Sequence, residues 1–150
     1  MTFDKDIVNP GHTFVAIQQG NIRRVFGYYP NTTVDPYSPN DKKAFGNDEG
    51  HTFDVSLSVP INSGQLLNLL GYVNNVPSTY NLNTYNCSDF AIQIGNLVGL
   101  DLPDSYGTWT GGGGSNPGQL GQNIRNMTLP KNVSRQTTEA NAASNKGTCN

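Results

Sequence analysis

The pattern of apolar and polar residues predicts strands along three stretches in the first sixty residues. The first two stretches, 12–18 and 22–29, are separated by Gln19-Gly20-Asn21, which suits a hairpin turn. The third stretch, 51–59, alternates over its whole length. Residues 30–50 are rich in Pro, Asn, Asp and Gly, and we expect an irregular excursion there.

Two later stretches carry apolar residues at helical spacing instead. The first is expected to run from Ser63 to about Val73 and the second from Cys87 to Leu100. Asn86 is a good N-cap for the second, and Asp89 three residues later completes a pair like a capping box. A short helix can also form from Gln119 to Asn126. The predicted fold class is α+β, a small antiparallel sheet packed against two helices.

A chain of 150 residues suits one domain with its own core, which we place at residues 1–130. Residues 131–150 contain almost no large apolar side chains, so we expect a flexible C-terminal tail. Trp109 is followed closely by the glycines 111–114, and this run predicts a mobile loop.

Composition narrows the classes of partner. Charged residues make up 13% of the chain, the net charge is −2, and the basic residues form no dense cluster, which argues against nucleic acid. No stretch is long and apolar enough for a membrane span. The N-terminus carries Asp4 and Asp6 where a signal peptide would be basic. If the protein reaches the periplasm or the extracellular space, we expect a route without an N-terminal signal peptide.

Cys87 is the first candidate for chemistry. A thiol in the first turn of a helix faces unpaired backbone N–H groups and the positive end of the helix dipole, and both favour the thiolate. Cys87 could therefore be a nucleophile, or it could be a buried cysteine that only packs. We expect no Cys87–Cys149 disulfide, because Cys149 lies one residue from the end of the predicted tail.

Both histidines precede the cysteine, and each follows a glycine in the string Gly-His-Thr-Phe. His12 could be a general base for the thiol or a half-buried histidine at a sheet edge. His51 lies on the apolar phase of its stretch, so it could orient His12, act as the base, or bond within the core. Together with Cys87 and Asp89 the histidines would make a ligand set of zinc type. None of these residues has the spacing of a metal motif, and we predict neither metal nor cofactor.

The order of these motifs resembles a known family. Gly11-His12-Thr13-Phe14 comes first, and Asn86-Cys87-Ser88-Asp89-Phe90 opens a later helix. This order is similar to the circularly permuted branch of the papain-like hydrolases, which is related to the NlpC-type cell-wall peptidases and includes the lecithin:retinol-acyltransferase-like proteins. The resemblance covers roughly residues 10–100 and implies a permuted papain-like fold.

The resemblance also implies roles for particular residues. Cys87 would be the nucleophile and His12 the base. The family's third polar residue usually lies on the strand after the histidine, but this chain has Phe26-Gly27-Tyr28-Tyr29 there. His51 is our substitute for that residue and Tyr28 the second choice.

We therefore predict a cysteine amidase or peptidase. The family suggests bacterial cell-wall peptide as the substrate, and an antibacterial effector of this kind could have an immunity or inhibitor protein as partner. Tyr28, Asp89 and Trp109 are the residues expected to contact substrate. One alternative is a non-catalytic module on the same fold that binds carbohydrate or peptide through Tyr28, Tyr29, Tyr37 and Trp109. Another is an acyltransferase that uses the same Cys–His pair.

Overall fold

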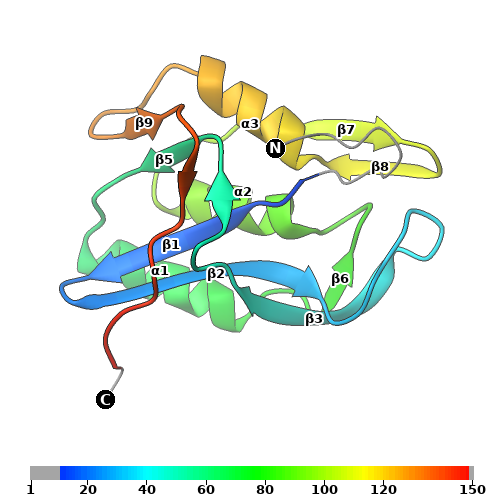
Figure 1. Ribbon diagram of the computed structural model, residues 1–150, viewed down its shortest axis with the longest axis horizontal. Coiled ribbons are helices and arrows are strands. Elements are labelled where there is room, and N and C mark those ends of the chain that lie inside the picture. Colours follow the sequence, from blue (N-terminus) through cyan, green and yellow to red (C-terminus); the bar gives the residue numbers. More distant parts are fainter. Residues whose placement is uncertain (1–10, 149–150) are drawn as a thin grey trace.

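The structure is a computed structural model that describes residues 11–148. Its helices are α1 (Ser63–Asn74), α2 (Cys87–Leu97) and α3 (Pro117–Asn126). Its strands are β1 (Phe14–Gln19), β2 (Ile22–Pro30), β3 (Asn40–Asn47), β4 (Thr52–Phe53), β5 (Ser56–Ser58), β6 (Thr79–Asn81), β7 (Tyr106–Trp109), β8 (Gly112–Ser115), β9 (Ser134–Gln136) and β10 (Ala140–Asn141). The α+β class with a small antiparallel sheet is confirmed, and the short helix expected from Gln119 to Asn126 is present as α3 (Figure 1).

The main sheet has four antiparallel strands in the order β1-β2-β3-β6. The predicted hairpin joins β1 to β2, and Gly20 at its turn has a φ of +56°, a conformation that glycine adopts without strain. Phe14 pairs with Gly27 at the open end of this hairpin. β3 then pairs with the second half of β2, from Phe26 opposite Asn47 to Pro30 opposite Lys43.

Two predictions about the strands were wrong. The region 30–50 is not irregular throughout, because it contains β3. This strand is largely polar and is held by ladders to β2 and β6 on its two sides, so its side chains give little periodic signal. The predicted strand 51–59 is broken into β4 and β5, which lie outside the main sheet and pair with β10 and β9. Alternation predicts an extended segment but does not identify its partner.

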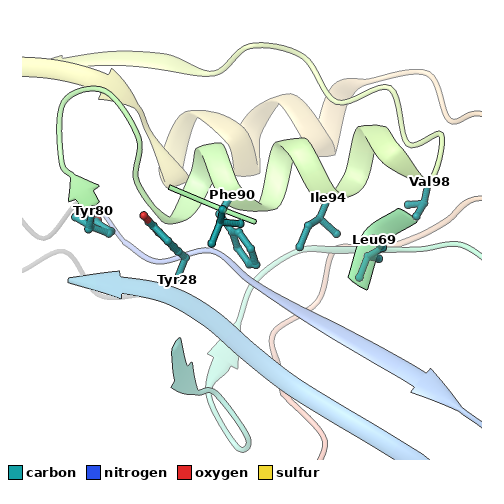
Figure 2. Packing of buried hydrophobic residues seen from close by; sticks show 7 residues of the cluster. Tyr28, Leu69, Tyr80, Phe90, Ile94 and Val98 are labelled. Carbon is teal, nitrogen blue, oxygen red and sulfur yellow. The ribbon is translucent and has the colours of Figure 1, made fainter. Parts of the chain in front are cut away.

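Helices α1 and α2 supply the core that covers the sheet. Phe90 of α2 stacks on Tyr28 of β2 with ring centroids 5.6 Å apart, and Ile94 continues the buried face of the helix (Figure 2). Burying a side chain of this size contributes roughly 1.5–3 kcal/mol, so this contact anchors α2 firmly to the sheet. Both predicted helices are confirmed, although α1 is capped by Asn62 and α2 ends at Leu97.

The glycine run forms a hairpin, and the mobile loop predicted from its composition is not what the structure shows. Strands β7 and β8 pair from Tyr106 opposite Ser115 to Trp109 opposite Gly112. A Cβ on Gly112 would overlap the side chain of Asn83, and one on Gly114 would lie 2.7 Å from the backbone oxygen of Asn83. Glycine is needed here because two backbone segments approach each other closely.

The segment that we predicted to be a flexible tail lies against the body of the protein as far as residue 148. Strand β9 pairs with β5, and β10 pairs with β4. Farther along, Lys146 forms an antiparallel bridge with Arg23 of β2. In Figure 1 this last part of the chain, coloured red, crosses in front of β1 and β2. The predicted domain boundary at residue 130 therefore does not separate a free tail within the described residues.

Candidate active site

The start of α2 holds Cys87 through a network of caps. The side chain of Asn86 accepts a hydrogen bond from the Ser88 N–H at 2.8 Å, and Asp89 Oδ2 accepts one from the Asn86 N–H at 2.8 Å. This is the capping box that the sequence predicted. Asp89 Oδ1 accepts a further bond from the Ser115 hydroxyl at 2.5 Å. Both carboxylate oxygens of Asp89 thus bond within the protein and fix the helix start, and its contact with substrate stays a prediction.

The segment before β1 lies directly against this helix start. The backbone N–H of Thr13 donates to the Cys87 sulfur, and the Thr13 hydroxyl lies 3.1 Å from that of Ser88. His12 is the residue next to Thr13, so the predicted base and the predicted nucleophile come from adjoining segments. Direct contact between the His12 ring and the Cys87 sulfur stays a prediction.

Asp48 is the nearest charged partner of His12. The Nε2 atom of His12 lies 3.4 Å from both carboxylate oxygens of Asp48, which is only 1% exposed. The Tyr29 hydroxyl donates to Asp48 Oδ1 at 2.5 Å, and its ring lies 4.3 Å from that of His12. Gly27 makes room for this pair, because a Cβ there would lie 2.5 Å from His12 Nε2 and 2.6 Å from Asp48 Oδ2. The strand after the histidine therefore has a glycine, Gly27, where a side chain would block the His12–Asp48 contact. The carboxylate itself comes from Asp48, directly after β3.

A tight turn brings His51 to the same carboxylate. The His51 N–H donates to the Asp48 carbonyl at 3.0 Å, and Gly50 takes a φ of +74°, which the turn requires. His51 Nδ1 lies 3.4 Å from Asp48 Oδ1, but its side chain is 45% exposed. His51 is therefore at the rim of the cluster, with its ring centroid 5.7 Å from that of His12, and Asp48 is the carboxylate that touches both histidines.

Sequence analysis missed Asp48. The string Asn47-Asp48-Glu49-Gly50 ends in a glycine just before His51, which is a turn signal. That signal could have placed Asp48 beside His51. It could not have shown that His12, 36 residues earlier, lies on the same carboxylate.

The two titrating groups are shifted in opposite directions by burial. Burial lowers the pKa of His12 below its ordinary value of 6.5, and the carboxylate of Asp48 opposes this shift. Burial also raises the pKa of the Cys87 thiol, while the Thr13 N–H and Ser88 oppose it. The expectation that the helix start lowers the pKa of Cys87 was wrong, because desolvation of the sulfur outweighs the helix start and the bonds to Thr13 and Ser88. At neutral pH both groups are thus uncharged.

Tyr80 lies beside the cysteine on the side of β6. Its hydroxyl is within hydrogen-bond reach of the Cys87 sulfur and of the Cys87 backbone N–H. Burial raises the pKa of Tyr80, so its hydroxyl keeps its proton and can donate. Next to this pair is a hollow of about 230 Å³, its open mouth included, whose lining residues are Gly11, Tyr80, Leu82, Asn86, Cys87, Trp109, Ser115 and Pro117.

Tyr28 and Trp109, the other two residues expected to bind substrate, lie in different environments. Tyr28 is fully buried, and its hydroxyl donates to the carbonyls of Pro77 and Thr79 at 3.0 Å each. Tyr28 therefore belongs to the core and neither binds substrate nor orients a histidine. Trp109 lines the hollow together with Cys87, and its Nε1 donates to Asn83 Oδ1 at 3.1 Å. Trp109 is thus the one of the three that is placed to touch a ligand near the thiol.

Within residues 11–148, no group of three or more His, Cys, Asp and Glu side chains is arranged to hold a metal ion. In the same part of the chain, no helix has the length and apolar character needed to cross a membrane. Cys87 is a free thiol, and Cys149 lies outside the described residues. The chain matches no protein-family model, no curated protein and no solved structure.

Proposed function

We propose that this protein is a cysteine amidase or peptidase of permuted papain-like fold. The observation that carries the proposal is the contact between Thr13 and the Cys87 sulfur, which brings the segment of His12 to the start of α2. His12 in turn touches a buried carboxylate, Asp48. A nucleophile, a base and a group that orients the base are the three parts that acyl transfer to a thiol needs.

The shifts of pKa decide how the first step would run. His12 is neutral at pH 7 because its pKa is lowered, so it can accept a proton. Cys87 is a protonated thiol because its pKa is raised. His12 would therefore take the thiol proton as the sulfur attacks the amide carbonyl, without a thiolate formed beforehand. Asp48 would stabilise the imidazolium that results and hold the ring in place.

The rest of the cycle follows from this step. As the C–N bond breaks, His12 returns its proton to the leaving amine, and the acyl group stays on sulfur as a thioester. His12 then takes a proton from water, the hydroxide attacks the thioester, and the C–S bond breaks to give a carboxylic acid and the thiol. The oxyanion of both tetrahedral intermediates would be stabilised by the Cys87 N–H and the Tyr80 hydroxyl, which lie together.

Bacterial cell-wall peptide is the substrate class that the family resemblance suggests. The hollow beside Cys87 offers Trp109, Tyr80 and Leu82 as apolar walls, which suits a small uncharged side chain next to the scissile amide. An antibacterial effector with an immunity protein remains the biological setting that we propose for such an activity.

The test is hydrolysis of purified peptidoglycan and its soluble peptides, followed by mass spectrometry of the products. We expect new carboxyl and amine ends with the wild-type protein and none with Cys87→Ser or His12→Ala. Both variants should keep the wild-type circular dichroism spectrum. Wild-type protein that binds the fragments but releases no product would overturn the proposal.

That outcome would favour the second candidate, a binding module on the same fold. Its support is the burial of the Cys87 sulfur together with two exposed aromatic residues near Trp109. Tyr37 packs on Gly111 of the β7–β8 turn, and Tyr106 lies on β7 itself. Exposed aromatic rings are suited to stacking on sugars or peptides. In this case Cys87→Ala would bind cell-wall fragments as well as the wild-type protein does.

A further inference from the structure

The end of the chain completes the sheet edge from which the Asp48 turn departs. β3 pairs with β2 only from Phe26 onward, so the first half of β2 has no β3 partner on that edge. Residues 140–147, called the C-terminal strap from here on, begin as β10 beside β4 and reach this place at Asn145 and Lys146. Within the strap, Lys146 exchanges two backbone hydrogen bonds with Arg23 of β2, at 2.9 and 3.1 Å.

The strap also holds the turn that carries Asp48 and His51. The Gly50 N–H donates to the Ala142 carbonyl at 2.9 Å, and the Ala142 N–H donates to the His51 carbonyl at 2.8 Å. Ala142 is buried beneath these bonds. The side of the turn that follows Asp48 is thus tied to the strap by two backbone bonds.

Asn145 makes the connection on the other side of the turn. Its Nδ2 donates to Asn47 Oδ1 at 2.8 Å, and its backbone N–H donates to the Glu49 carboxylate at 2.8 Å. Its Oδ1 accepts from the Val25 N–H of β2 at 2.7 Å. One side chain therefore joins the residue before Asp48 to the central strand of the sheet.

We propose that the C-terminal strap is part of the site, because it holds Asp48 against His12, and that Asn145 is a positioning residue for this contact. Asp48 reaches His12 from the end of β3, and its own N–H bonds only to the Val25 carbonyl at 3.2 Å. Short loops hold a side chain precisely only when their backbone is fixed on both sides. The strap supplies that fixation from more than ninety residues away in the sequence, since Asn145 and Glu49 are 96 positions apart.

Titration of the His12 ring tests the positioning without any assay of activity. In full-length wild-type protein, Asp48→Asn should lower the pKa of His12 measured by NMR, because the carboxylate raises it. In the Asn145→Ala background, Asp48→Asn should lower the pKa of His12 by a smaller amount, because the His12–Asp48 contact is already loosened. The His51→Gln variant serves to assign the two ring signals.

Asn141→Ala is the matched control. Asn141 lies in the same strap and accepts a hydrogen bond from the Thr52 hydroxyl at 2.9 Å, so its side chain contacts β4 and neither Asn47 nor Val25. In the Asn141→Ala background, Asp48→Asn should lower the pKa of His12 by as much as it does in the wild-type protein. An equal effect in the Asn145→Ala background as well would overturn the proposal. If Asn145→Ala does not fold, Asn47→Ala removes the loop side of the same contact together with the bond from the Glu49 N–H, and keeps the bond from Val25 to Asn145. An unchanged effect of Asp48→Asn in the Asn47→Ala background would then overturn the proposal.

The effect of the strap on catalysis rests on the proposed function, and it is measured by kinetics and not by the NMR titration. Asn145→Ala should lower kcat by about 10-fold to 100-fold with little change in KM, the usual cost of a displaced catalytic group. Asn141→Ala should leave both near the wild-type values. Absence of hydrolysis by the wild-type protein would remove the proposed function and leave the NMR result to decide on the strap. An unchanged kcat in Asn145→Ala, in an active wild-type background, would overturn the role of Asn145.

Discussion

The nucleophile side of the site and the histidine side are built in different ways. Cys87 stands in five consecutive residues, 86–90, whose caps and buried Phe90 are all encoded locally. His12, by contrast, meets a carboxylate from the end of β3, over a glycine of β2, in a turn that the C-terminal strap holds. The caps that place the cysteine are thus local to one helix start, which Thr13 and Ser115 reinforce from other segments, whereas the contact that places the histidine is assembled wholly from four separate segments.

The difference also appears in the chemistry of the two sides. Burial raises the pKa of Cys87 and lowers that of His12, so each favours its uncharged form. Only the histidine has a buried carboxylate to oppose the shift. The histidine side is therefore where charge can develop at lower cost, and where the site is most sensitive to changes far away in sequence.

Removal of the nucleophile should have the largest effect. Cys87→Ala should reduce hydrolysis by about 10⁴-fold or more, and His12→Ala added to it should reduce it little further, because nucleophile and base act as one unit. The loss of a buried sulfur should lower the free energy of unfolding by no more than about 1–2 kcal/mol. Steady-state kinetics and urea unfolding give these two quantities. Residual activity in Cys87→Ala at the level of His51→Ala would contradict the assignment.

Loss of the carboxylate should come next and separates Asp48 from His51. Asp48→Asn should lower kcat by about 10² to 10⁴-fold, since an amide can neither stabilise the imidazolium nor hold the same tautomer. His51→Ala should lower kcat far less, because its ring is nearly half exposed and lies at the rim of the cluster. Asp104→Asn, at an exposed position, controls for the change of charge. If His51→Ala proves the more damaging of the two, the third position belongs to His51 as the sequence first suggested.

The contrast between the two sides explains what could be predicted from the sequence. Helix caps and apolar periodicity act over three or four residues, so α2, its capping box and the β1–β2 hairpin were predicted. Asp48, the hairpin β7–β8 and the strap depend on pairing between distant segments. Their composition predicted loops, because β3 and the C-terminus are polar and β8 is a run of glycines. Tyr28 failed as a site residue because strand alternation alone does not say which face is the core.

The hydroxyl of Tyr80 should have an effect of intermediate size on the cysteine side. Tyr80→Phe should lower kcat by about 10²-fold, the usual cost of one donor to an oxyanion. Tyr85→Phe is the matched control, because Tyr85 is a tyrosine of the core region whose hydroxyl bonds to that of Tyr72. Kinetics of the two variants at equal stability make the comparison. Equal losses would mean that Tyr80 only packs against Cys87.

Trp109 should affect binding more than chemistry. Trp109→Ala should raise KM by about 10-fold, equivalent to roughly 1.4 kcal/mol, and change kcat little. The reason is that Trp109 lines the hollow beside Cys87 and is held by a hydrogen bond to Asn83, which does not belong to the His12–Asp48 cluster. Trp109→Phe keeps a ring at the position and should recover most of the affinity. A fall in kcat with unchanged KM would instead connect this hairpin to the placement of Cys87.

Alkylation of the thiol should show the smallest effect and bears directly on the contrast in pKa. In a Cys149→Ser background, iodoacetamide should react with native Cys87 several-fold more slowly than with the urea-unfolded chain between about pH 6 and 8.5, because only the thiolate reacts. The midpoint of the rate against pH should lie higher in the native protein, as burial raises the pKa of this thiol. The midpoint separates the raised pKa from simple obstruction of the reagent, which lowers the rate at every pH by the same factor. Fast reaction at pH 6 would mean that Cys87 is already a thiolate. The resting site would then hold its proton on His12 and not on the sulfur.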